Sequence, residues 1–337
     1  GVLWPLFHYL GDKVNLDAES DWETFKKVNV RFADAVAGTF DGDVIWVHDY
    51  QLALTPRLLR ERAPNARIGF FLHVPFPSEQ IFRILPWREE VLRGLLGADV
   101  IGFQTAQDAN HFITACAQVL GLDDAVDVLA YDGRAVRVGA YPISIDAKAI
   151  SRLAAQEDVL AEAATMRAES QGRQIMLGVD RLDYTKGIRR HVRALERAFE
   201  EESELASRVK LIQVAVPTRL GTPAYAQFNR EVHEVVGRVN AKFASVQVTP
   251  IHLLQRALTM RELEPLYVAA DVMLVTPMRD GMNLVAKEYV ASRNEETGVL
   301  ILSEFAGAAA ELSEALIVNP NDLRGMAQAM KLALAMS

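Results

Sequence analysis

Short apolar runs alternate along the chain with longer segments in which apolar and charged residues recur at helical spacing. Each run spans only a few residues and is mostly apolar, which is typical of strands buried on both faces of a parallel sheet. The predicted strands are residues 44–47, 68–72, 100–103, 136–142, 175–179, 209–216, 272–277 and 299–303.

Amphipathic segments separate these runs. Clear examples are residues 55–63, 106–120 and 187–205, of which the last carries charged residues along its outer face. Strands that alternate with helices are typical of parallel sheets covered by helices on both faces. The pattern therefore predicts an α/β fold.

One segment interrupts this alternation. Residues 146–172 contain no strand signal and consist largely of alanine and charged residues. They separate two arrays of strands and helices, and a chain of 337 residues is long enough to bury two cores of ordinary size. We predict two domains, residues 1–145 and 146–337.

Composition narrows the class of ligand. The net charge of −8 argues against nucleic-acid and membrane-surface binding, because both need clustered Lys and Arg, and it favours a small molecule. No apolar run reaches the roughly 18 residues that a membrane span needs. A single cysteine, Cys116, excludes an internal disulfide, as is typical of a cytoplasmic protein. It lies in an apolar stretch, which predicts a buried core thiol. The seven histidines show no metal-ligand spacing, so we expect no metal and no cofactor.

Polar side chains follow the predicted strands at the points where the strands end. They are His48 and Asp49, His73, Gln104, Asp180 and Arg181, Thr218 and Arg219, Arg279 and Asp280, and Glu304. Each alone is explained equally well as a helix cap or a loop polar group. Open α/β sheets bind ligands beyond the carboxyl ends of their strands, so the whole set predicts a ligand rich in hydroxyls and phosphates.

The stretch LVTPMRDGMNLVAKEY, residues 274–289, joins a predicted strand to a short helix through an Asp-Gly pair. Because Gly281 has no Cβ, we expect the N–H groups of Met282, Asn283 and Leu284 to be accessible at a helix N-terminus. Such a terminus is suited to bind an anion.

Glu288 lies seven residues after Gly281, which is about 10 Å along a helix. A nucleoside diphosphate on the helix start would place its ribose level with this carboxylate. Asp280 would face the group beyond the phosphates. The alternative interpretation is that Asp280 is an N-cap and that Glu288 pairs with Lys287 or Arg293.

A second candidate anion site is GVDRLDYTKG, residues 178–187. Arg181 follows a predicted buried strand and Lys186 lies in the loop after it, so two positive charges can converge on one diphosphate. The alternative is that Arg181 forms a structural bridge with Asp180 or Asp183.

The chain also contains long and specific motifs. They read LWPLFHYL, VIWVHDYQLALTPRLLR, IGFFLHVPFPSEQIFRILPWREEVLRGLLGADVIGFQT, DRLDYTKGI and VTPMRDGMNLVAKEY. These motifs resemble those of the trehalose-6-phosphate synthase family, and the resemblance runs from Trp4 to about Asn319, nearly the whole chain. The resemblance implies the GT-B fold, two Rossmann-like domains facing across a cleft. It also implies retaining transfer of glucose from a UDP- or GDP-linked donor to glucose 6-phosphate, which gives trehalose 6-phosphate.

The resemblance assigns roles to individual residues. Catalytic roles fall on Arg181, Lys186, Asp49, His73 and Asp280, and substrate-binding roles on Trp4, Arg219, Gly281, Met282, Asn283, Leu284, Val285 and Glu288. On the donor side, Arg181 and Lys186 would bind the diphosphate, and Glu288 the ribose. Asp280, with the amides that follow it, would hold the donor sugar and phosphate.

His73 would also contact the donor sugar, while Asp49, Trp4 and Arg219 would belong to the acceptor side. The second domain would then bind the nucleotide sugar, and the first would carry most of the acceptor side. We favour a same-face substitution in which the leaving phosphate accepts the proton of the acceptor, since the resemblance supplies no carboxylate nucleophile.

Several alternatives stay open. The same scaffold serves glucosylglycerol-phosphate synthases and pseudo-glycosyltransferases that couple a nucleotide-linked cyclitol to an amino-cyclitol phosphate. A non-catalytic sugar-phosphate-binding relative would also fit. The protein could in addition form a homo-oligomer. The family has a glycine-rich loop and a phosphate-binding arginine upstream of the region that resembles Trp4. The chain begins at Gly1 and ends in a helical pattern, so we expect a fragment of a longer enzyme.

Overall fold

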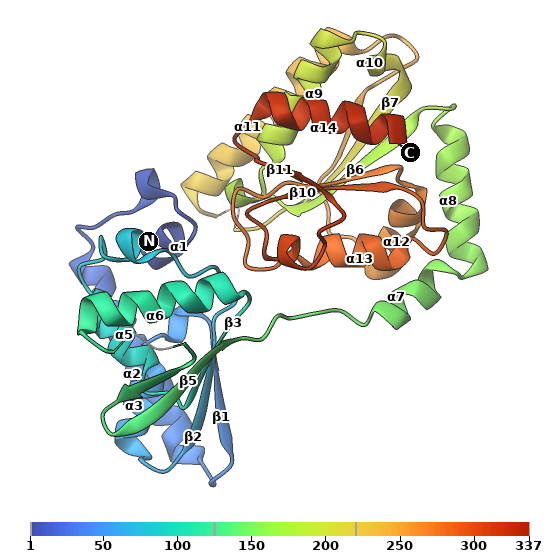
Figure 1. The fold of residues 1–337 in the computed structure, drawn as a ribbon. Coiled ribbons are helices and arrows are strands. Elements are labelled where there is room, and N and C mark those ends of the chain that lie inside the picture. Colours follow the sequence, from blue (N-terminus) through green and yellow to red (C-terminus); the bar gives the residue numbers. More distant parts are fainter. Residues whose placement is uncertain (1, 124–125, 220, 337) are drawn as a thin grey trace. The chain divides into compact units, whose positions relative to one another are not determined.

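Two β-sheets organise the chain, one in each of two units, Gly1–Ile143 and Ser144–Ser337 (Figure 1). The computed structural model describes residues 2–123, 126–219 and 221–336. Both units are α/β, as the alternation of strands and helices predicts. The roles assigned to domains 1–145 and 146–337 stay a prediction.

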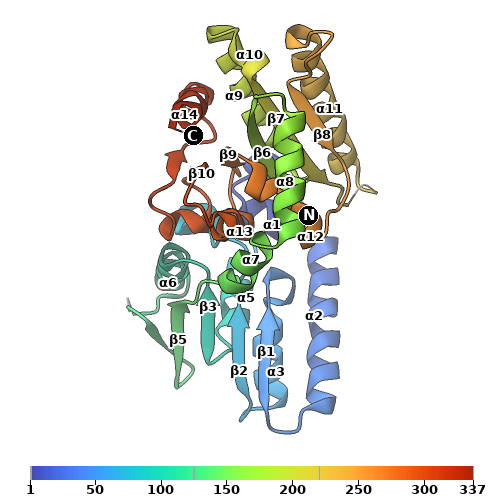
Figure 2. The ribbon, with the colours of Figure 1, turned by 90° about the vertical axis from the view of Figure 1, so that its right-hand side faces the viewer.

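The first unit contains a five-stranded sheet of order β1-β2-β3-β5-β4. Its strands are β1 Val44–His48, β2 Arg67–Phe71, β3 Val100–Phe103, β4 Val128–Tyr131 and β5 Arg134–Ala140. Figure 2 shows β5, β3, β2 and β1 side by side. β4 is antiparallel to β5 and was not predicted, although its Asp132-Gly133 turn, with both φ values positive, is a hairpin signal.

Helices connect these strands and cover the aromatic core. They are α1 Leu3–Phe7, η1 Gly11–Lys13, α2 Glu19–Thr39, η2 Tyr50–Leu52, α3 Thr55–Arg62, α4 Glu79–Phe82, α5 Arg88–Leu95 and α6 Ala106–Leu120. The predicted helix 106–120 is confirmed. It begins where the Thr105 hydroxyl accepts a hydrogen bond from the Asp108 N–H, and it ends at the left-handed Gly121.

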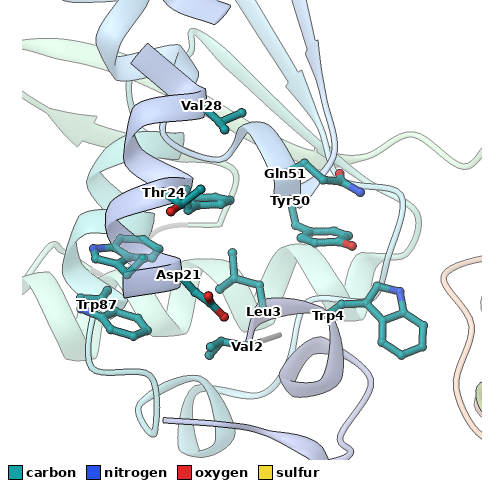
Figure 3. A pocket seen from close by; sticks show the side chains of 11 residues that line it. Val2, Leu3, Trp4, Asp21, Thr24, Val28, Tyr50, Gln51 and Trp87 are labelled. Carbon is teal, nitrogen blue, oxygen red and sulfur yellow. The ribbon is translucent and has the colours of Figure 1, made fainter. Parts of the chain in front are cut away.

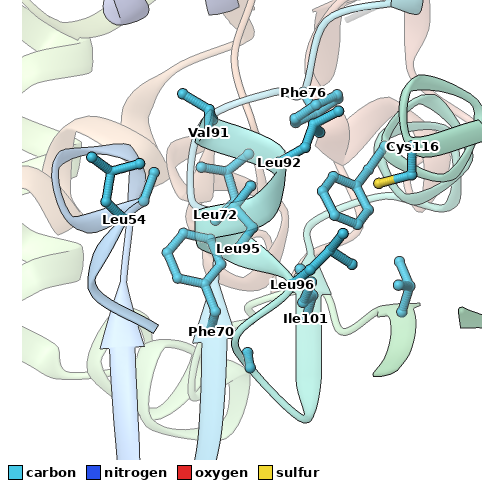
Figure 4. Close-up of a cluster of buried hydrophobic side chains, with 14 of the residues drawn as sticks. Leu54, Phe70, Leu72, Phe76, Val91, Leu92, Leu95, Leu96, Ile101 and Cys116 are labelled. Atoms are coloured by element: carbon cyan, nitrogen blue, oxygen red, sulfur yellow. The ribbon is translucent and has the colours of Figure 1, made fainter. Parts of the chain in front are cut away.

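Fully buried Phe76 lies at the centre of the first core, packed against Phe7, Phe82, Phe103 and Phe112. Figure 4 shows Phe76, Cys116 and aliphatic side chains of the same cluster. Cys116 is buried and free, which confirms the predicted core thiol, and burial raises its pKa.

The second unit contains a six-stranded, all-parallel sheet of order β11-β10-β9-β6-β7-β8. Its strands are β6 Gln174–Arg181, β7 Val209–Val216, β8 Ile251–Leu254, β9 Val272–Val275, β10 Val299–Ser303 and β11 Leu316–Val318. β9 ends two residues before the predicted end, because Pro277 has no N–H to donate to a neighbouring strand. The short edge strands β8 and β11 were not predicted.

Helices cover both faces of this sheet. They are α7 Ala147–Ala154, α8 Glu157–Glu169, η3 Tyr184–Lys186, α9 Ile188–Glu201, α10 Leu205–Arg208, α11 Pro223–Phe243, α12 Met260–Ala269, α13 Leu284–Ser292, η4 Gly307–Ala310 and α14 Leu323–Met336. One core cluster joins the sheet to α9, α11 and α14, and a second joins it to α8, α12 and α13. None of the helices in the described ranges is long and apolar enough to cross a bilayer.

The predicted single helix 187–205 is wrong at its C-terminal end. α9 stops at Glu201, and α10 forms a separate turn from Leu205 to Arg208. Glu200, Glu201 and Glu202 place three negative charges at the C-terminus of α9, where the helix dipole disfavours them.

The order of the strands creates a topological switch point between β6 and β9. The chain passes from β6 to β7 and β8 on one side, and then returns to β9 on the other side of β6. The connections after β6 and β9 therefore leave toward opposite faces of the sheet. This is the position at which open α/β sheets bind ligands.

We expect Phe76→Ala to destabilise the first unit by about 3–5 kcal/mol, because it leaves a cavity in the centre of the aromatic cluster. All four tryptophans, at positions 4, 22, 46 and 87, lie in residues 1–143. Urea unfolding followed by tryptophan fluorescence therefore reports this unit. Phe32→Ala, at a side chain that is 50% exposed, is the matched control and should shift the transition little. Equal shifts for both variants would contradict this account of the core.

Candidate functional site

The two loops at the switch point touch through their backbones. One loop runs from β6 to α9 and the other from β9 to α13, and the Met278 N–H donates to the Thr185 carbonyl at 2.7 Å. Gly187 has φ +76°, and a Cβ atom there would lie 2.1 Å from the Thr276 carbonyl oxygen. Only glycine fits this position, so the contact depends on the absence of a side chain.

This contact brings together two predicted site residues that are 94 positions apart in the sequence. The Lys186 ammonium donates to Asp280 Oδ2 in an ion pair whose side chains are 13% and 18% exposed. The Asn283 amide donates to the same Asp280 oxygen at 3.1 Å. A cation and a carboxylate are thus held in place at the carboxyl ends of the strands.

The start of α13 differs from the alternative interpretation of the sequence. Asn283, not Asp280, is the N-cap; it has φ +77°, and its side-chain oxygen accepts from the Ala286 N–H at 3.3 Å. The alternative that made Asp280 the cap is therefore wrong. Because α13 begins at Leu284, the N–H groups of its first turn have no carbonyl partner within the helix.

The segment after β10 fixes the backbone of residues 280–282. The Asp280 N–H donates to the Phe305 carbonyl at 3.0 Å, and the Gly307 N–H donates to the Asp280 carbonyl at 3.1 Å. A Cβ atom on Gly307 would lie 1.9 Å from the Gly281 carbonyl oxygen. The loop that carries Asp280 is therefore held on two sides.

Glu288 is half-buried on α13 and accepts a hydrogen bond from the hydroxyl of fully buried Tyr267 at 3.0 Å. Burial and the Glu288 carboxylate both raise the pKa of Tyr267. Lys287 pairs instead with Glu311 at 2.8 Å, and the Arg293 guanidinium donates to backbone carbonyls and to a threonine hydroxyl. The alternative pairing of Glu288 with Lys287 or Arg293 is wrong, and Tyr267 carried no sequence signal.

Arg181 is exposed at the end of β6, beside the Lys186 loop. Within the described ranges it forms no ion pair with Asp180 or Asp183, so the predicted alternative of a structural bridge is absent there. Asp183 instead accepts from the N–H and hydroxyl of Thr185, each at 2.9 Å. The Arg181 guanidinium is thus exposed and is not paired with either of these carboxylates.

Arg219 follows β7 and is tied to the same loop. Its guanidinium donates to the Tyr225 hydroxyl at 3.1 Å, and that hydroxyl donates to Asp183 Oδ2 at 3.1 Å. Burial, followed by the charge of Asp183, raises the pKa of Tyr225 to about 12. Arg181, Lys186 and Arg219 therefore occupy the ends of neighbouring strands in the second unit.

A buried polar chain that the sequence did not reveal continues from the end of β6. Asp180 Oδ2 is 3.4 Å from the Gln213 amide nitrogen, and Gln213 Oε1 is 2.6 Å from His191 Nε2. His191 Nδ1 is 3.2 Å from the Thr276 hydroxyl. A Cβ atom on Gly178 would lie 2.3 Å from Gln213 Oε1, so the glycine leaves the space that the amide crosses.

In the first unit, Asp49 and His73 meet at the ends of the paired strands β1 and β2. Asp49 has φ +68° and ψ 165°, and its carboxylate accepts from the His73 N–H at 3.2 Å. His48 Nδ1 and His73 Nε2 are 2.9 Å apart, and burial lowers the pKa of His73. A non-glycine residue in this backbone region costs about 1–3 kcal/mol, and such strain clusters at functional sites.

Trp4, the other predicted acceptor-side residue of the first unit, lies on α1. Its ring stacks on His8 with centroids 4.3 Å apart, and it borders a pocket of about 380 Å³. The other described residues that line it are Val2, Leu3, Asp21, Trp22, Thr24, Phe25, Val28, Tyr50, Gln51 and Trp87, and Figure 3 shows Trp4 next to Tyr50. Asp49 and His73 are not among these residues. No group of three or more His, Cys, Asp or Glu side chains in residues 2–123, 126–219 and 221–336 is arranged to hold a metal ion.

A sequence profile described as glycosyltransferase family 20 matches residues 1–337. A UDP-forming alpha,alpha-trehalose-phosphate synthase of Aspergillus fumigatus is 45% identical over 341 residues, which cover 100% of this chain and 66% of that protein. The chain thus spans about two thirds of that relative.

Solved structures share the fold. A UDP-forming synthase of the same type from Burkholderia xenovorans, in complex with glucose-6-phosphate, has a TM-score of 0.94 and 40% identity, covering 100% of this chain and 74% of that one. A structure from E. coli bound with UDP-2-fluoro glucose has a TM-score of 0.94 and 38% identity, covering 100% and 75%. These neighbours confirm the predicted GT-B fold class.

We expect Gly187→Ala to destabilise the second unit, because the new methyl group meets the Thr276 carbonyl and the left-handed backbone costs a further 1–2 kcal/mol or so. Differential scanning calorimetry should show a lowered melting transition. The control is Gly237→Ala in α11, where nothing lies within 4 Å of the new Cβ, and alanine should be neutral or mildly stabilising. An unchanged transition for Gly187→Ala would show that the loops do not depend on this contact.

Proposed function

Because the chain belongs to glycosyltransferase family 20, we propose that the complete protein transfers glucose from UDP-glucose to glucose 6-phosphate with retention of configuration. The product would be α,α-trehalose 6-phosphate, and UDP would be released. The names of the curated relatives, which are UDP-forming synthases, favour UDP over GDP as the donor nucleotide. The ligand of the Burkholderia structure favours glucose 6-phosphate as the acceptor.

The observation that carries the proposal is the arrangement of Arg181, Lys186 and Asp280 at the switch point. A cation at the end of β6 and a second in the loop after it suit a diphosphate, and a carboxylate held beside them suits sugar hydroxyls. The amides of the first turn of α13 add a partial positive charge for a phosphate. We therefore assign the whole nucleotide to the second unit.

The chemical step would rest on charge stabilisation. As the bond from the sugar to the diphosphate breaks, negative charge grows on the leaving oxygen, and Arg181 and Lys186 would stabilise it. The leaving phosphate would then accept the proton of the acceptor hydroxyl on the same face. Glu288, held by the Tyr267 hydroxyl, would bind only the ribose, which does not change during the reaction.

The acceptor side is assigned to Asp49, His73, Trp4 and Arg219. Support comes from the strained backbone of Asp49 and from the hydrogen bond that the His73 backbone N–H donates to its carboxylate, which orients the carboxylate. Arg219, exposed and braced by Tyr225, is a candidate for the acceptor phosphate.

The direct test is an assay of the complete protein with UDP-glucose and GDP-glucose against glucose 6-phosphate, glycerol 3-phosphate and an amino-cyclitol phosphate. Products are identified by mass and by anomeric configuration. The proposal expects α,α-trehalose 6-phosphate from UDP-glucose and glucose 6-phosphate. A different acceptor, or inversion of the anomeric centre, would contradict it.

We expect Lys186→Ala to lower kcat by about 10²–10³, which corresponds to roughly 3–4 kcal/mol, because it removes a cation that meets charge in the transition state. Steady-state kinetics with both substrates at saturation measure this. Lys186→Arg should not restore the rate fully, since a planar fork replaces a compact charge.

The matched control for Lys186→Ala is Lys287→Ala. Lys287 is a similarly buried cation that pairs with Glu311, and its side chain is 7% exposed. If both variants lowered the melting temperature and neither lowered kcat at saturation, Lys186 would have only a structural role.

We expect Glu288→Gln to raise the KM for UDP-glucose about 10- to 100-fold with kcat nearly unchanged, because a hydrogen bond from ribose to a charged group is worth about 1.5–3 kcal/mol. The measurement is a KM and kcat series in UDP-glucose. Glu295→Gln, on an exposed residue after α13, is the control and should change neither constant. A loss confined to kcat would place Glu288 at the reacting centre instead.

A further inference from the structure

The Asp180 carboxyl group is buried directly beside Arg181, a residue of the proposed diphosphate site. It is 6% exposed, and its position at the end of β6 puts it within electrostatic reach of Lys186, Asp183 and Asp280. We propose that Asp180 is a positioning residue that takes up a proton when a nucleoside diphosphate binds. The inference rests on the proposed function, which places the diphosphate on the loops of Arg181 and Lys186.

The donor and acceptor of each hydrogen bond in the buried polar chain that ends at Asp180 can be assigned. The Gln213 amide nitrogen lies near two acceptors, Asp180 Oδ2 and the Val214 carbonyl at 3.1 Å, so Gln213 Oε1 must be the acceptor toward His191. Burial lowers the pKa of His191 to about 4, and the ring is neutral at physiological pH. His191 Nε2 therefore donates to Gln213, and Nδ1 accepts from the Thr276 hydroxyl.

This assignment leaves Asp180 with a single, long hydrogen bond from a neutral amide. A buried carboxylate needs several donors or a close cation to stay ionised at low cost. The nearest cation, Lys186, is already paired with Asp280. The surroundings of Asp180 therefore favour the neutral acid.

The charged and titratable groups that face Asp180 act in both directions. Burial is the largest effect and raises its pKa, Lys186 and the Gln213 amide lower it, and Asp280 and Asp183 raise it. The result is a pKa of about 7, against 3.8 for an ordinary aspartate. Tyr267, from α12, also interacts with Asp180 and stays uncharged, since its own pKa is raised. At neutral pH the group is thus divided between its two forms.

A diphosphate on the Arg181 and Lys186 loops adds negative charge close to this carboxyl group. A like charge disfavours ionisation, so binding raises the pKa of Asp180 further and draws a proton from solvent. Once Asp180 is neutral, the charge of Lys186 is offset by Asp280 and no longer by Asp180 as well. Protonated Asp180 would thus leave more of the Lys186 charge available to the diphosphate, and ionised Asp180 would not.

The raised pKa of Asp180 also makes the stability of the folded state depend on pH. Because the folded pKa lies above the unfolded value, the folded state binds the proton more tightly. The associated stability is fully present below about pH 4 and is lost as the pH rises through about 7. Asp180→Asn keeps the shape of the side chain without its charge. The free energy of unfolding of this variant, relative to that of the wild type, should therefore be higher at pH 8 than at pH 6.

The test is isothermal titration of the protein with UDP at pH 8, in buffers of different ionisation enthalpy. At this pH the phosphate of UDP is already ionised and contributes little proton exchange of its own. We expect the wild type to take up a proton, close to one per UDP, and Asp180→Asn to take up none. Asp180→Asn should bind UDP as the wild type does at pH 6, and up to about tenfold more tightly at pH 8.

Asp158→Asn is the matched control. Asp158 lies on α8 in an exposed ion pair with Arg261, with its side chain 59% exposed, and the variant should show the proton uptake of the wild type. If UDP binds to the wild type at pH 8 without proton uptake, the inference is overturned and the proposed function stands. If UDP does not bind at all, both are overturned. The wild-type result decides even if Asp180→Asn fails to fold.

Discussion

The loops at the switch point of the second sheet lie together because one residue between them has no side chain. Gly187 adopts a left-handed conformation against the Thr276 carbonyl, and any Cβ atom would occupy the space of that oxygen. The contact has no chemistry of its own. It nevertheless sets the distance between a cation from the first loop, Lys186, and a carboxylate from the second, Asp280. The arrangement of charges at the site is thus decided by backbone sterics before any ligand is considered.

Behind this contact the sheet carries polar groups in its interior, which is unusual for a parallel sheet with apolar strands. The chain of hydrogen bonds from Thr276 through His191 and Gln213 to Asp180 crosses from a loop to a helix and back to a strand. Satisfied buried networks of this kind rigidify their surroundings, whereas a partly satisfied member is costly. The same network therefore makes this region rigid and ends in a titratable group, Asp180.

Local patterns in the sequence were enough to predict most of the framework. Continuous apolar runs marked the central strands, and the motifs around Lys186 and Asp280 marked the two loops. What failed depended on partners distant in the sequence or on weak local signals: the short edge strands, the cap at Asn283, and the pairing of Tyr267 with Glu288. Gln213 reads in the sequence as one polar residue in a strand. Its role depends on a glycine in the neighbouring strand, and no spacing rule connects the two.

Three residues of the candidate site, Asp49, Arg219 and Asn283, have positive φ angles although they carry side chains. Glycine would adopt each conformation without steric cost. A search for more thermostable variants would therefore tend to enrich glycine at these positions, and would remove the carboxylate, guanidinium and amide that the geometry presents there. At each of these positions, a substitution that relieves backbone strain would therefore also remove a polar side chain of the candidate site.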